Sequence, residues 1–226
     1  MRVTENLGVI RELLAAACRD AGRGGDPVRL LAVSKMQPVT GVLAAAEAGQ
    51  RDFGENFVQE GIDKMAASGR NDLVWHFIGH LQSNKTRPVA THFHWVHTVD
   101  RFKIAERLSE QRPADRADLN ICLQVNVDNQ AGKSGIACNE VLPLARRVAG
   151  LPRIRLRGLM CLPAIRQGFP AQREPFARLR ELFEELRRDG LPVDTLSMGM
   201  SDDFRAAVFE GSTIVRIGTA LFGARQ

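Results

Sequence analysis

The sequence predicts an α/β protein in which eight parallel strands close into a single (β/α)8 TIM-like barrel, preceded by an extra N-terminal helix. Strand-like and helix-like segments alternate along the 226 residues, which is typical of a parallel sheet. The length suits one α/β barrel. No linker, low-complexity segment or shorter repeat divides the chain, so we expect one domain over residues 1–226. An open doubly wound sheet is the alternative.

Each predicted element follows from its own spacing of apolar and turn residues. Residues 3–21 repeat apolar side chains at helical spacing before a glycine-rich turn, which predicts a leading helix and turn within residues 1–24. Apolar runs predict strands over 28–34, 51–55, 73–79, 95–99, 118–127, 154–163, 193–199 and 213–218. Helical patterns lie over 39–49, 56–68, 81–93, 101–111, 139–150, 174–190 and 202–211, with a last short turn at 219–223.

The composition predicts a soluble protein, and its mild basic surplus suits a small anionic ligand as well as any polymer. The net charge is +5 and only 6% of residues are aromatic, so the basic residues lack the aromatic partners typical of nucleic-acid binding. The N-terminal segment has too short an apolar run for a signal peptide or a membrane span. We therefore expect a cytoplasmic protein with four reduced cysteines: Cys18, Cys122, Cys138 and Cys161.

Lys35 directly follows the first predicted strand and raises the question of function. A buried-strand pattern runs directly into this ammonium group, and Pro38 stops the strand from simply continuing. A lysine in this place either extends its amine to water or takes part in chemistry. Because the site of such a barrel lies where the strands end, we expect Lys35 at the same mouth as the polar residues that end other strands.

The last two strand–helix units predict a phosphate site. Gly199 ends the seventh strand, and we expect Ser201 to cap the following helix. Gly218 and Thr219 start another helix after the eighth strand. Free amides at two helix N-termini, beside glycine and hydroxyl groups, favour a phosphate, and these loops bind phosphate in many barrels. Ordinary helix capping is the alternative for either segment alone.

Arg216 adds a second cation at the same mouth. It precedes Gly218 by two residues, so strand alternation points both residues in one direction. A lysine desolvated near other cations has a lowered pKa and attacks aldehydes. Lys35, Arg216 and a phosphate cradle therefore indicate a phosphate-bearing aldehyde held as a Schiff base, which is pyridoxal 5′-phosphate (PLP).

Two other motifs carry no function in this interpretation. The Gly-Lys-Ser run at 132–134 lacks the earlier glycine of a P-loop, because Val127 occupies that position. His92, His94 and His97 have no organised carboxylate partner, so we expect surface or capping histidines and no metal site.

A resemblance to a known family rests on motifs in a fixed order between residues 30 and 225. They are AVSK, FGENF-QE, WHFIGHLQSNK, KSGI, RGLM, LSMGMSDD and GST-VRIGTALFGAR. The chain is similar to the pyridoxal phosphate homeostasis proteins. This resemblance implies a barrel like the N-terminal domain of bacterial alanine racemases, without their second, β-rich domain.

The resemblance also implies roles for single residues. Lys35 matches the lysine that forms the internal aldimine, and Arg216 matches the arginine that faces the pyridine nitrogen. Ser201, Gly218 and Thr219 match the phosphate cradle. The implied cofactor site is completed by Met200, Asn56, His76 and Met198.

The chain departs from the family pattern at Gln37, Phe57 and His80. These departures leave Lys133 as the remaining candidate for a lysine that passes the cofactor onward.

We expect a cofactor-binding homeostasis protein rather than an enzyme. Racemisation needs a second acid/base opposite the lysine, a tyrosine in the related racemases, and this chain contains no tyrosine. An arginine at the pyridine nitrogen weakens the electron sink that carbanion chemistry requires. The expected monomer would hold PLP on Lys35 and pass it to apo PLP-dependent enzymes. A racemase or other PLP enzyme, and a Schiff-base aldolase without PLP, are the alternatives.

Overall fold

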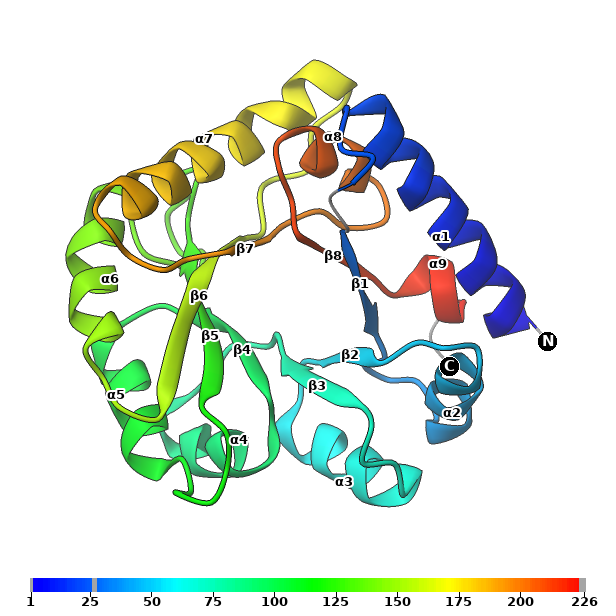
Figure 1. The fold of residues 1–226 in the computed structure, drawn as a ribbon, viewed down its shortest axis with the longest axis horizontal. Coiled ribbons are helices and arrows are strands. Elements are labelled where there is room, and N and C mark those ends of the chain that lie inside the picture. The colour runs from blue at the N-terminus through cyan, green and yellow to red at the C-terminus, as the bar shows by residue number, and fades with distance from the viewer. Residues whose placement is uncertain (1, 26–27, 224–226) are drawn as a thin grey trace.

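The computed structural model describes residues 2–25 and 28–223, and its eight parallel strands close into one barrel (Figure 1). The strands follow one another in sequence order, and β1 pairs with β8 to close the sheet. The predicted α/β barrel with an N-terminal helix is therefore confirmed, and the open doubly wound alternative is wrong.

The strands lie inside the ranges predicted from the apolar runs. Their bounds are β1 (Arg29–Val33), β2 (Asp52–Glu55), β3 (Val74–Phe77), β4 (Trp95–Val99), β5 (Leu119–Val125), β6 (Ile154–Cys161), β7 (Thr195–Ser197) and β8 (Ile214–Ile217). Successive side chains of each strand point alternately toward the helices and into the barrel. Each short strand therefore contributes only a few side chains to the interior.

Helices surround the sheet and bury its outer face in one large apolar core. They are α1 (Arg2–Asp20), α2 (Val39–Glu47), α3 (Val58–Ser68), α4 (Thr86–His92), α5 (Phe102–Gln111), α6 (Val141–Ala149), α7 (Phe169–Arg188), α8 (Phe204–Phe209) and α9 (Thr219–Phe222). Two 3-10 turns, η1 (Ser83–Lys85) and η2 (Cys138–Glu140), precede α4 and α6. In the described part of the chain, no helix has the length and apolar character needed to cross a membrane.

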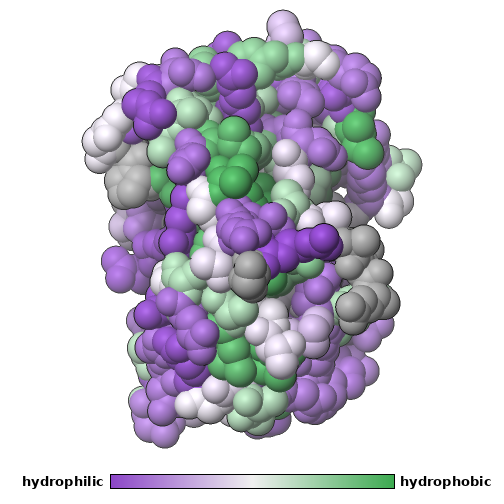
Figure 2. Space-filling view, turned by 90° about the vertical axis from the view of Figure 1, so that its right-hand side faces the viewer, coloured by the Kyte–Doolittle hydropathy of each residue, from purple (hydrophilic) through white to green (hydrophobic). Residues whose placement is uncertain are grey.

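The extra helix α1 lies outside the ring and packs against α2, α8 and α9 (Figure 1). Asn6 Nδ2 donates to Leu221 O at 2.9 Å, which ties α1 to α9. Figure 2 views this side of the molecule, where hydrophobic residues form separate patches between hydrophilic ones. The buried stripe of α1 recurs at helical spacing: Leu7, Ile10, Leu14 and Ala17.

Helix α7 begins at Phe169, well before the predicted start at residue 174. The prediction placed Pro175 in the first turn, where proline is usually tolerated. In the structure Pro170 holds that place, after Gly168 with its φ of 84°. Pro175 instead lies buried inside the helix.

Candidate functional site

A cavity of about 720 Å³ opens at the carboxyl ends of the strands. All of the predicted site residues except His76 and Met198 line it. The full lining is Val33, Lys35, Gln37, Asn56, Ile78, Met160, Leu162, Met200, Ser201, Asp202, Arg216, Gly218, Thr219, Ala220 and Gly223.

Lys35 reaches this cavity from the loop that joins β1 to α2. The strand pairing continues one residue past β1, because the Ser34 amide donates to Gly54 O at 3.0 Å. The next residue after Lys35, Met36, has a φ of 57°, which is the left-handed region. This turn redirects the chain directly after Lys35, so the half-buried lysine lines the mouth of the barrel.

Ser201 does not cap a helix, and in this respect the prediction is wrong. Helix α8 begins at Phe204, and Asp203 holds the N-cap position. The carboxylate of Asp203 accepts the Met200 amide at 2.6 Å and so closes the turn before the helix. Burial raises the pKa of Asp203, although this hydrogen bond opposes the shift. Within the described residues the Ser201 hydroxyl has no hydrogen-bond partner, so it remains available to a ligand.

Two glycines shape the cradle beside Ser201. A Cβ atom on Gly199, whose φ is 97°, would lie 2.7 Å from Ala207 Cβ. A Cβ atom on Gly218 would lie 3.2 Å from Val33 O, so a side chain would crowd the end of β1. Gly218 is also the N-cap of α9, and the Thr219 amide therefore has no earlier helical carbonyl to bind. Together these groups can bind an anion.

Arg216 forms the cavity wall with only 4% of its surface exposed. Its Nη1 donates to Ser197 O at 2.6 Å and to Ser197 Oγ at 2.7 Å, and its Nη2 donates to Cys161 O at 2.8 Å. Burial lowers the pKa of Arg216, but a guanidinium remains protonated in proteins. Because these acceptors are neutral, the positive charge is available to a ligand.

Asn56 places an unmet hydrogen-bond acceptor at the cavity wall. Its Oδ1 is buried and has no partner within the described residues. The backbone of Asn56 is tightly packed, because a Cβ atom on Gly79 would lie 2.0 Å from Asn56 O. A buried polar atom without a partner costs about 1–3 kcal/mol. A ligand that donates a hydrogen bond here would recover that cost.

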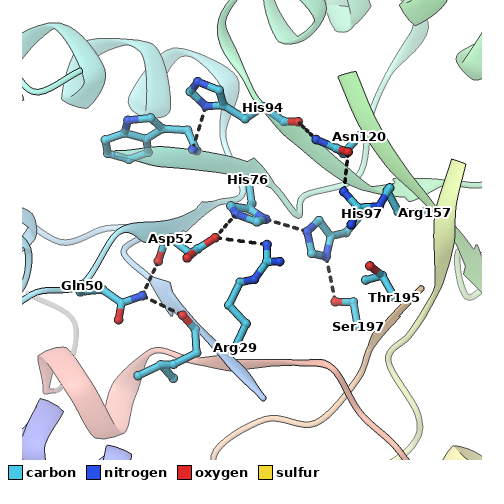
Figure 3. A network of polar contacts seen from close by, with 12 residues as sticks. Arg29, Gln50, Asp52, His76, His94, His97, Asn120, Arg157, Thr195 and Ser197 are labelled. Atoms are coloured by element: carbon cyan, nitrogen blue, oxygen red, sulfur yellow. Dashed lines mark hydrogen bonds and ion pairs between the residues drawn. The ribbon is translucent and has the colours of Figure 1, made fainter. Parts of the chain in front are cut away.

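His76 and Met198 lie outside the cavity, contrary to the expectation that they line it. Met198 is fully buried in the core between sheet and helices, because its neighbour Ser197 takes the interior-facing position. His76 does face the barrel interior, where its ring lies between Asp52 and His97 (Figure 3), but the cavity is lined by Ile78, two residues further along the chain. Its Nε2 lies 3.0 Å from Asp52 Oδ1, and its Nδ1 lies 2.9 Å from His97 Nε2.

His94 and His97 correct the prediction of surface or capping histidines. His94 Nδ1 accepts the amide of Trp75 at 3.0 Å, and burial lowers the pKa of His94 to about 4. His97 is fully buried, and its Nδ1 lies 2.8 Å from Ser197 Oγ. In the described part of the chain, no group of three or more histidine, cysteine, aspartate or glutamate side chains is placed to hold a metal ion.

These contacts define the tautomers of the two buried imidazoles. The Asp52 carboxylate can only accept, so His76 donates from Nε2 and must accept at Nδ1 from His97 Nε2. His97 Nδ1 then accepts the hydroxyl proton of Ser197. Burial lowers the pKa of both histidines, which keeps them neutral. A chain of hydrogen bonds thus runs from Asp52 to Ser197, which in turn accepts from Arg216.

Apolar residues that the sequence interpretation did not assign complete the cavity wall. Ile78 and Met160 are inward-facing by strand alternation, since Ile78 follows His76 by two residues and Met160 pairs with Ser197. That alternation is the signal that could have identified them. Lys133, by contrast, is exposed on the loop after β5 and does not line the cavity.

Comparison of sequences assigns the chain to known relatives. Residues 7–226 match the family described as Alanine racemase, N-terminal domain. The chain is 55% identical over 224 residues to the Pyridoxal phosphate homeostasis protein of Pseudomonas aeruginosa, covering 99% of this chain and 96% of that protein. It is 49% identical over 227 residues to the protein of the same name from Escherichia coli, covering 99% and 97%.

Solved structures agree with this assignment. PipY of Synechococcus elongatus, solved with PLP bound, has 36% identity and a TM-score of 0.86 over 98% of this chain and 100% of that one. Alanine racemase from Corynebacterium glutamicum shares the fold at 17% identity, with a TM-score of 0.70 over 99% of this chain and 60% of that chain. The chain therefore belongs to the family of pyridoxal phosphate homeostasis proteins, whose barrel is the alanine racemase N-terminal domain.

Proposed function

We propose that this chain binds PLP in the cavity at the carboxyl ends of the strands and acts in PLP homeostasis. The observation that carries the proposal is the convergence of Lys35, Arg216 and the Ser201–Gly218–Thr219 cradle on one cavity. An amine, a fixed guanidinium and an anion cradle suit an aldehyde that carries a phosphate and a ring nitrogen. The PLP-bound relative PipY supports the same ligand for this chain.

Each group of the cavity suits one part of PLP. The Ser201 hydroxyl and the Thr219 amide suit the phosphate, because both can donate hydrogen bonds to an anion. The Lys35 amine suits the aldehyde and is the proposed point of covalent attachment. Arg216 suits the pyridine nitrogen, to which it can donate. The unpartnered Asn56 Oδ1 suits a further polar group of the ligand.

The same residues favour retention of the cofactor over turnover. When bound, PLP supplies an electron-withdrawing ring that stabilises negative charge beside an amino group. Arg216 cannot give up a proton, so it leaves the ring nitrogen unprotonated and weakens that effect. Asp202 is the one carboxylate among the described lining residues, and it is exposed to solvent. The chain also has no tyrosine to act as a second base.

An absorbance spectrum tests the proposal. We expect the protein with PLP to show a visible band that borohydride removes, and peptide mass spectrometry to locate the reduced pyridoxyl group on Lys35. The Lys35→Ala variant should lack the band, whereas Lys103→Ala, which removes an exposed lysine of α5, should keep it. A colourless protein would favour the aldolase alternative. Label on another lysine would refute attachment through Lys35.

Exchange of α-protons separates a carrier from an enzyme. We expect no sustained incorporation of deuterium into amino acids when the PLP-loaded protein is incubated with them in deuterated water. Sustained exchange would favour the racemase alternative, which the shared barrel keeps open. The proposed carrier is a cytoplasmic monomer that passes PLP to apo PLP-dependent enzymes, and transfer to an apo-enzyme would appear as recovery of that enzyme's activity.

A further inference from the structure

The backbone on both sides of Lys35 is held by two charged side chains of α3. Lys64 Nζ donates to Ser34 O at 2.6 Å, directly before Lys35. Glu60 Oε1 accepts the amide of Met36 at 2.5 Å, directly after it. Lys64 and Glu60 are one helical turn apart and are themselves paired at 2.7 Å. Two hydrogen bonds and one ion pair therefore bracket the residue that lines the cavity.

The hydrogen bonds from Lys64 and Glu60 oppose a local backbone strain. Met36 has a φ of 57°, a conformation that costs a residue with a side chain free energy unless its surroundings impose it. The carboxylate of Glu60 fixes the Met36 amide in that conformation. The turn directs the chain into α2 and leaves Lys35 at the mouth of the barrel.

A third charged residue, Glu55, binds both Ser34 and Lys64. Glu55 is fully buried, and its Oε1 accepts from Ser34 Oγ at 2.6 Å and from Lys64 Nζ at 2.9 Å. Burial raises the pKa of Glu55, although both hydrogen bonds oppose that shift. Its second oxygen, Oε2, has no partner within the described residues.

Such a cluster is an unfavourable way to pack a helix on a sheet. Buried ion pairs lose most of their Coulombic gain to desolvation, and apolar residues of similar volume often stabilise a protein as well or better. The side chain of Lys64 is only 9% exposed and that of Glu55 is inaccessible, so the cost applies here. What this cluster provides, and apolar packing cannot, is directional hydrogen bonding to the loop backbone.

We infer that Glu60 and Lys64 are positioning residues for Lys35, an inference that rests on the proposed function. They hold the Ser34–Met36 backbone so that the Lys35 amine meets the aldehyde of a phosphate-bearing ligand without reordering the loop. Freeing this backbone would allow Lys35 to leave the cavity and to react faster with reagents in solution. It would also weaken the retention of PLP.

Labelling of Lys35 in the apo protein tests the inference without the cofactor. Formaldehyde with a mild reductant methylates accessible lysines, and peptide mass spectrometry gives the rate at Lys35 relative to Lys103 in the same molecule. Glu60→Ala should raise this ratio several-fold, whereas Glu60→Gln, which keeps an acceptor oxygen, should remain near wild type. Glu181→Ala removes an exposed helical carboxylate elsewhere and is the matched control.

PLP release gives the second measurement. We expect Glu60→Ala to release PLP about tenfold faster, as the loss of one hydrogen bond to a charged group implies. Lys64→Met should also speed the release of PLP, provided that this variant folds. If it does not fold, the Glu60 variants test the inference alone, because Glu60 is partly exposed and its replacement is less disruptive. Unchanged labelling and release in folded Glu60→Ala would overturn the inference. Failure of wild type to bind PLP would overturn the proposed function, while the apo labelling would still decide the role of Glu60.

Discussion

The buried pair His76 and His97 should make this protein less stable in mild acid. Both imidazoles are inaccessible to solvent, and burial lowers the pKa of each below its ordinary value. The unfolded chain therefore takes up protons at these positions before the folded chain does. The free energy of unfolding is therefore highest above the pKa that these histidines have in the unfolded chain, and it decreases as the pH falls through that pKa. The replacement His97→Gln removes one of the two titrating groups and keeps hydrogen-bonding capacity.

The size of the effect follows from proton linkage. An unfolded histidine has a pKa of about 6.5, and each histidine that stays neutral when folded costs about 1.3 kcal/mol between about pH 7 and pH 5.5. Wild type should therefore lose up to about 2.6 kcal/mol from the pair over that range, and His97→Gln about 1.3 kcal/mol less than wild type. Burial also lowers the pKa of His94 to about 4, which adds a further loss, but equally in both proteins. Burial raises the pKa of Glu55 and of Asp203, which acts in the opposite direction, but equally in both proteins.

Urea unfolding at the two pH values measures this difference. The quantity to compare is the change in unfolding free energy with pH in each protein, because His97→Gln will also lower stability at both pH values by disturbing its neighbours. His80→Gln removes an exposed imidazole and should follow wild type. If wild type and His97→Gln lose the same free energy on acidification, His97 is not held neutral in the folded barrel and the hydrogen-bond chain has been assigned wrongly.

Two further predictions concern strain and thiol reactivity. Gly199→Ala should destabilise the protein by about 2 kcal/mol or more, from positive-φ strain together with overlap on Ala207. Gly190→Ala shares the positive φ but has open space around it, so thermal unfolding should show a smaller loss, and equal losses would contradict the predicted overlap. Burial raises the pKa of Cys122 and of Cys161 to about 12, so a thiol reagent should label these two cysteines only after unfolding. Mass spectrometry locates the label, and label on either cysteine in the native protein would contradict this prediction.

The fold was predictable because each strand carries its own local signal. Apolar runs bounded by turn residues are a property of a few adjacent residues, and eight of them in alternation with helices leave few topologies. Lys35 and Gly218 were predictable for a related reason. A residue directly after a strand of a parallel barrel lies at the carboxyl mouth whichever face its neighbours take. The functional end of the molecule can therefore be located from the order of elements alone.

The direction of a side chain within a short strand was less predictable. β3 and β7 have so few residues that either phase of alternation fits the sequence. The sequence therefore did not show that His76 points into the barrel or that Met198 points away from it. The boundary of α8 failed for a different reason. Ser201 and Asp203 are both good N-cap residues, and the choice between them depends on the tertiary packing of the turn.

The chain of hydrogen bonds from Asp52 to Ser197 could not be predicted from the sequence, because His97 and Ser197 come into contact only when the sheet closes. Its chemistry nevertheless suits the cavity above it. Ser197 Oγ can accept from Arg216 because its own hydroxyl donates a hydrogen bond to His97 Nδ1. His97 Nδ1 is an acceptor because burial keeps this histidine neutral and its Nε2 donates to His76, which donates onward to a carboxylate. A carboxylate in place of Ser197 would hold the guanidinium as well, but would neutralise its charge. Two neutral imidazoles keep the acidic group at the far end of the chain of hydrogen bonds, and so the arginine is fixed in position while its charge remains for the ligand.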